Sequence, residues 1–114
     1  MSNSRDIRVA AGQFALRAGV NQVVVPLTGD VITAREACTD LTLVPAGQLA
    51  TLTVKFPKAP AEGDEFCITS SFGITALTLD GNGRGILAPI GVLTTGGFAT
   101  YKFRTFGSTW YRKG

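Results

Sequence analysis

The chain has 114 residues, enough for one domain with a modest core and too few for two ordinary domains. Charged residues make up 17% of it, against about 25% in an average globular domain, so either a partner covers part of the surface or Ser and Thr supply its polarity. The net charge is +3 and there is no histidine, so the usual general base of hydrolases is missing, and we expect a protein that binds or assembles.

Residues 1–9 are predicted to form an arm that precedes a folded domain, residues 10–114. No apolar signal segment follows the polar start, so we expect synthesis in a cytoplasm with reduced thiols. The candidate partner-binding residues of the arm are Arg5, Ile7, Arg8 and Val9. The two apolar side chains would dock against a strand edge while the arginines face acidic groups. The alternative is a disordered, tag-like terminus.

The β signal is weaker in the rest of the N-terminal third. Gly12–Gly19 is short and bounded by glycines, whereas Asn21–Leu27 is rich in β-branched residues and predicts a strand. Val31–Cys38 is compatible with a helical turn, a strand or irregular structure, and we favour the last two.

A first hairpin is predicted where Leu41–Val44 and Leu49–Phe56 flank the turn residues Pro45–Gly47. In the second segment, apolar residues at every second position from Ala50 to Phe56 alternate with Thr and Lys. This period of two is typical of a strand with one buried face.

The chain continues with a proline-containing loop over 57–64 and strands over Glu65–Ser70 and Ile74–Leu79. Asp80–Gly85 is the strongest turn signal, since Asp-Gly and Asn-Gly favour positive φ. A short extended segment, Ile86–Ile90, follows it.

A second hairpin is predicted from Phe98–Arg104 and Thr109–Arg112, joined by a turn at Gly107 and Ser108. Eight to ten short strands separated by turns indicate an all-β fold, a single antiparallel β-sandwich or jelly-roll-like domain. The predicted core consists of Ala50, Leu52, Val54, Phe56, Phe66, Ile68, Leu77, Leu79, Tyr101 and Phe103.

The residues that could hold a metal or a phosphate have simpler interpretations. Cys38 and Cys67 form no CxxC motif, and we expect them to stay unlinked, with Cys67 a small buried hydrophobe. Gly81–Gly85 lacks the helix that a dinucleotide fingerprint requires. Asp80 and Asn82 are spaced like calcium ligands, but the rest of that loop is absent. We expect no catalytic residue, no cofactor and no metal site.

Two charged regions allow a functional and a structural interpretation. The carboxylates Glu62, Asp64 and Glu65 could pair for glycoside chemistry, but a solvated turn is favoured. Residues 81–114 carry five Lys and Arg and no acidic residue. They could meet nucleic acid, or they could be strand-edge charges. The second interpretation is favoured, because Tyr101 and Phe103 share the strand face opposite Lys102 and Arg104. Trp110 and Tyr111 belong to the same hairpin.

Three stretches carry a resemblance to known proteins: Leu49–Pro57, Ile74–Gly83, and Gly96–Arg104 together with Thr109–Arg112. From about Leu41 onward, the chain resembles small β-sandwich virion proteins of tailed bacteriophages. The resemblance is strongest to head decoration (cement) proteins, and it extends to tail and fibre modules. It brings no catalytic motif with it.

This resemblance implies a virion structural protein on the capsid surface. We expect it to bind across neighbouring major capsid proteins and to stabilise the shell as a homo-oligomer, a dimer or trimer, without membrane contact or a role in binding nucleic acid. A free chain of this size suits decoration better than a fibre, which needs a long shaft. The alternative is a tail, baseplate or fibre-tip module that binds a host-surface receptor. An enzyme of uncharacterised type is the third possibility.

Overall fold

The structure is a computed structural model that describes residues 20–114. All regular structure in this range is β-strand, which confirms the all-β class. The predicted arm and residues 10–19 of the predicted domain lie outside the described residues. The strands are β1 (Val20–Val24), β2 (Val31–Thr33), β3 (Cys38–Leu43), β4 (Leu49–Lys55), β5 (Glu65–Ser70), β6 (Ile74–Asp80), β7 (Gly85–Leu87), β8 (Phe98–Arg104) and β9 (Thr109–Arg112).

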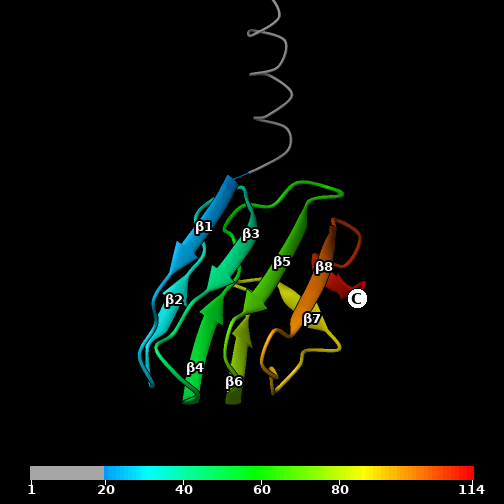
Figure 1. Cartoon of the computed structure of the whole chain (residues 1–114). Helices are drawn as coiled ribbons and strands as arrows, with labels where there is room; N and C mark the ends of the chain where they lie inside the picture. Colours follow the sequence, from blue (N-terminus) through cyan, green and yellow to red (C-terminus); the bar gives the residue numbers. More distant parts are fainter. Residues whose placement is uncertain (1–19) are drawn as a thin grey trace, which may run out of the picture.

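The strands form two sheets, with orders β1-β3-β5-β8-β9-β7 and β2-β4-β6. From β1 to β6 the chain alternates between the sheets, so each pair of consecutive strands makes one coil of a solenoid. Figure 1 shows β1, β3 and β5 side by side in one layer, with β2, β4 and β6 in the layer behind. We call β1–β2 the first coil, β3–β4 the second and β5–β6 the third.

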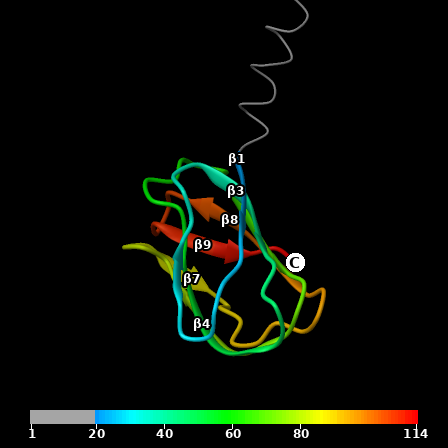
Figure 2. The ribbon, with the colours of Figure 1, turned by 60° about the vertical axis from the view of Figure 1, so that its left-hand side comes forward.

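The expected antiparallel pairing is wrong for most of the molecule. The strands of successive coils pair in parallel, β1 with β3, β3 with β5, β2 with β4 and β4 with β6. Among the named strands, antiparallel pairing involves only β8, which lies between β5 and β9. An isolated antiparallel bridge also joins Ile74 to Leu93. β7 then pairs in parallel with β9 at the end of the larger sheet (Figure 2). The described chain is therefore a three-coil parallel solenoid followed by an antiparallel hairpin.

The first predicted hairpin fails for the same reason. Leu41–Val44 contributes to β3 and Leu49–Phe56 to β4, and these strands lie in different sheets. Pro45–Gly47 carries the chain from one sheet to the other instead of reversing it within one. The second predicted hairpin is confirmed, because Phe103 pairs with Trp110 and Lys102 with Tyr111.

The core lies between the two sheets and contains most of the residues predicted for it. Leu79 is only partly buried, and Ala50 is exposed. Alternation breaks at Ala50 on β4, and the same break occurs in register on β6, where Thr75 and Ala76 are both exposed. The β1–β2 turn lies beside this part of β4. Gly29 N donates to Thr51 O at 2.9 Å, and Thr51 N donates to Thr28 Oγ1 at 3.1 Å. Leu49 and Leu52 are both buried, with two exposed residues between them.

An aromatic cluster fills the part of the core nearest the C-terminal hairpin. The ring centroid of Phe56 lies 4.8 Å from Phe66, 5.3 Å from Tyr101 and 5.2 Å from Trp110. Trp110 also contacts Phe103 at 5.3 Å. Tilted and edge-on arrangements at these separations stabilise aromatic pairs beyond the area they bury. The cluster joins β4 to β5, β8 and β9.

The predicted turn after β6 is present and depends on its small residues. Asn82 and Gly83 have φ of 54° and 93°, in the left-handed region. A Cβ on Gly81 would collide with the carbonyl oxygen of Arg84. Asp80 Oδ1 accepts a hydrogen bond from Asn82 N, and Asn82 Nδ2 donates to Phe56 O at 3.2 Å. The two side chains that resembled calcium ligands therefore hold the turn against β4.

Replacing Phe56 with alanine should lower the free energy of unfolding by about 3–5 kcal/mol, since it removes a fully buried ring from the cluster. Phe98→Ala is the matched control, because the Phe98 side chain is 58% exposed, and this change should cost less than about 1 kcal/mol. Urea titration followed by Trp110 fluorescence measures both variants. Equal losses would contradict the core assignment.

Candidate functional site

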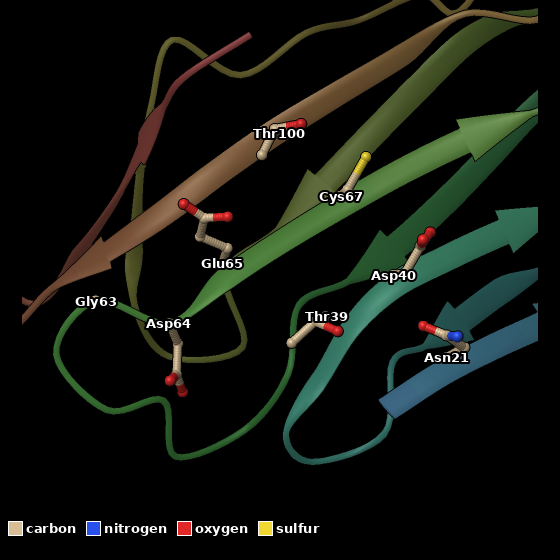
Figure 3. Close-up of a pocket in the computed structure, with 8 residues that line it drawn as sticks. All are labelled: Asn21, Thr39, Asp40, Gly63, Asp64, Glu65, Cys67 and Thr100. Atoms are coloured by element: carbon tan, nitrogen blue, oxygen red, sulfur yellow. The ribbon is translucent and has the colours of Figure 1, made fainter. Parts of the chain in front are cut away.

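A shallow polar groove crosses the outer face of the six-stranded sheet and has a volume of about 450 Å³ (Figure 3). Four of its side chains form one row across four strands. Asn21 on β1 lies opposite Asp40 on β3, which lies opposite Cys67 on β5, which lies opposite Thr100 on β8. The other lining residues are Thr39, Gly63, Asp64 and Glu65.

Strand alternation explains why these groups face outward. On β5, Phe66 and Ile68 are buried in the core while Cys67 between them is half-buried on the outer face. On β8, Ala99 and Tyr101 point inward and Thr100 outward. The row offers an amide, a carboxylate, a thiol and a hydroxyl, which suit hydrogen bonding to a polar ligand. Register between strands far apart in the sequence creates this row, so local sequence patterns could not predict it.

The buried cysteine of the structure is Cys38, not Cys67 as expected. Cys67, predicted to be a buried hydrophobe, is half-buried on the groove, with its Sγ 3.9 Å from Thr69 Oγ1. Cys38 is the buried thiol, and burial raises its pKa. Both are free cysteines in the structure. Reactivity follows thiolate character and exposure, so Cys67 is the more accessible nucleophile.

Alkylation of the native protein without reductant should modify Cys67 well before Cys38, because Cys38 is only 2% exposed and its pKa is raised. Peptide mass spectrometry over a time course measures both sites. Cys67→Ser should abolish the fast phase. A peptide pair linked through the two cysteines would contradict the expectation that they are unlinked.

The three carboxylates of Glu62, Asp64 and Glu65, just before and at the start of β5, bind different partners. Asp64 Oδ2 accepts a hydrogen bond from Ala61 N at 2.9 Å, within its own turn. Glu65 forms an ion pair of 3.3 Å with Lys102. Glu62 accepts hydrogen bonds from Thr105 N at 2.8 Å and from Arg104 Nη1 at 2.7 Å. These bonds, the backbone N–H first, lower the pKa of Glu62 from 4.5 to about 2.

Because the pKa of Glu62 is lower in the folded protein, its ionised form favours folding above pH 4.5, and this contribution is lost as the pH falls toward 2. We expect the wild type to lose more stability than Glu62→Gln over this range. Urea midpoints measured at several pH values test this. The loss should be small, because the carboxylate is fully exposed and screened by water. Glu36→Gln, which removes another exposed carboxylate, is the control variant. Identical dependence of stability on pH for the wild type and Glu62→Gln would refute the lowered pKa of Glu62.

Three aromatic residues of the basic C-terminal third lie in the core, and two of its cations lie in ion pairs. Lys102 and Arg104 are held in ion pairs with loop carboxylates. Tyr101, Phe103 and Trp110 are buried, as the alternation predicted for the first two. Single-strand binders stack bases on exposed aromatic rings, which these three residues do not offer.

An apolar pair lies beside the groove on the same outer face. The neighbouring row runs from Val23 through Thr42 and Thr69 to Phe98. Val23 is 65% and Phe98 58% exposed. The row therefore has an exposed apolar side chain at each end and two threonines between them. Apolar residues next to hydrogen-bonding groups are typical of protein interaction surfaces. We call this row the contact row.

The candidate contacts named from sequence, Arg5, Ile7, Arg8 and Val9, all lie outside the described residues. Within residues 20–114, no group of three or more Cys, Asp or Glu side chains could hold a metal ion. No helix in the described part of the chain is long and apolar enough to cross a membrane. No protein-family model matches the chain, and comparison with curated proteins gave no match.

Proposed function

We propose that the chain is a phage virion structural protein, a capsid decoration protein that binds across neighbouring major capsid proteins. The observation that carries this proposal is the contact row, where Val23 and Phe98 stand exposed on a broad sheet face. A sheet face of this kind can lie flat on a shell, where it buries its apolar residues and leaves the polar neighbours at the rim. The resemblance of the β4, β6 and β8–β9 sequences to virion proteins supports the same setting.

The proposed mechanism is clamping. Each copy adds buried area at a junction between capsid proteins, and a modest affinity per contact suffices when a homo-oligomer engages several sites at once. The arm, with Arg5, Ile7, Arg8 and Val9, is the second proposed contact to the shell. No cofactor and no covalent step is needed for such a role.

Phe98→Asp should weaken capsid binding by more than tenfold, since it places a charge in the contact row and a desolvated charge is costly in an interface. Thr78→Asp is the matched control, because Thr78 is exposed on the other sheet. Co-sedimentation with capsids that lack the protein measures binding. Deletion of residues 1–9 tests the arm in the same assay. Equal binding by wild type and Phe98→Asp would exclude the contact row, and no binding by any form would exclude decoration.

A tail, baseplate or fibre-tip module is the second candidate, and the polar groove favours it. Asn21, Asp40 and Thr100 present the amide, carboxylate and hydroxyl groups that hydrogen-bond to sugars. Copy number in purified virions separates the two functions. Hundreds of copies per particle support decoration, whereas a handful supports the tail. In the second case, glycan binding that is lost in Asp40→Ala would identify the groove as the receptor site.

A further inference from the structure

The two ends of the solenoid differ in how their strand edges are covered. At the third coil, β8 pairs along β5. The chain beyond β7 runs beside β6, where Ile74 N donates to Leu93 O at 2.7 Å and Leu77 N to Gly91 O at 2.8 Å. Both strands of this coil therefore have a neighbour beyond the coil.

The first coil has an open side within the described residues. There, β1 pairs only with β3, and β2 only with β4. Ala34 N donates to Lys55 O and Thr53 N donates to Asp30 O, so alternate peptide groups of this segment point toward β4. The peptide groups of Val31 and Thr33 consequently point away from β4, toward the open edge.

The β2 strand also lacks the features that usually protect an exposed edge. Its sequence, Val31-Ile32-Thr33, contains no Lys, no Pro and no charged residue. Val31 is more than half exposed, and so are Val25 and Leu27 in the connection that precedes the strand. Ile32 packs against the core but remains only partly buried, so the apolar core reaches the edge. An edge of this kind readily pairs with another strand.

The charges that flank β2 make its edge complementary to a second copy of itself. Asp30 directly precedes the strand, and Arg35 lies just beyond its other end. Neither side chain forms an ion pair with any residue in the range 20–114. Glu36 lies in the turn that leads to β3 and so leaves the edge. In an antiparallel pair of copies, Asp30 would lie opposite Ala34 of the second copy and next to its Arg35.

We propose that the β2 edge is a dimer interface, in which β2 pairs antiparallel with β2 of a second copy about a two-fold axis at Ile32. Val31 of each copy then lies opposite Thr33 of the other, and the two residues exchange both backbone hydrogen bonds. The two Ile32 residues form the non-hydrogen-bonded pair between them, with Cα atoms about 4.5 Å apart. Because Ile32 packs against the core, this pair joins the apolar layers of the two copies.

This inference goes beyond the proposed function, because it specifies a contact and a symmetry for the homo-oligomer and does not depend on a virion role. A two-fold contact uses the same surface on both copies, so it closes at a dimer and covers the β2 edge of each. β2 belongs to the smaller sheet, whereas the contact row crosses the larger one. Dimer formation is therefore measured without capsids, and its failure would leave the test of capsid binding intact.

Sedimentation equilibrium of the full chain tests the interface. Thr33→Pro removes an edge N–H that points away from β4, so it should raise the Kd of the dimer by about tenfold or more without breaking the β2–β4 ladder. Thr33→Ala keeps the N–H and should dimerise like the wild type. Trp110 fluorescence reports whether each variant remains folded. A monomeric wild type, or equal dimerisation by a folded Thr33→Pro variant, would overturn the proposal.

A disulfide tests the two-fold register independently of the proline variant. In a Cys67→Ser background, Ile32→Cys should form a disulfide between two chains under mild oxidation, because a Cα separation of about 4.5 Å is within the range that disulfides span. Val92→Cys, at an exposed position near the covered end, is the control and should form far less. Equal linking by both variants would overturn the register. A monomer whose Val31 and Thr33 amides resist hydrogen exchange would overturn the dimer in favour of coverage by the same chain.

Discussion

The packing of the Phe56 ring against Phe66, Tyr101 and Trp110 is the interaction on which the rest of the described fold depends. Phe56 directly follows β4 of the smaller sheet, whereas its three neighbours lie on strands of the larger sheet. Its backbone is held as well, because Phe56 N donates to Asp80 O at 2.8 Å. Ring and backbone together lock the second coil, the third coil and the C-terminal hairpin into one core.

Strand positions followed from local sequence, whereas strand partners did not. Alternation along β4, β5 and β8 is a property of successive residues, and it correctly marked Leu52, Phe66 and Tyr101 as core. Whether a strand pairs with its successor or with the strand one coil later depends on the path of the connection. Pro45–Gly47 has the composition of a hairpin turn, yet it crosses between sheets.

The same distinction applies to the candidate surfaces. That Cys67 and Thr100 face outward could have been read from alternation, but their position in one row with Asp40 requires the parallel register of β3 and β5. Glu62, Asp64 and Glu65 were expected to lie in a solvated turn. Their individual partners, such as Thr105 for Glu62, come from a strand end some 40 residues away, because the loop folds against the hairpin.

The parallel pairing also determines the order in which the fold can be made. Each strand of a coil meets its partner only after an entire intervening strand and two connections have been synthesised, whereas β8 and β9 are joined by a short turn. Distant pairings carry the entropy of closing long loops, so their formation is slow and the local hairpin is fast. During synthesis on the ribosome, Phe56 emerges long before Trp110. The early coils therefore remain incompletely packed until the last strand has been synthesised and completes the core.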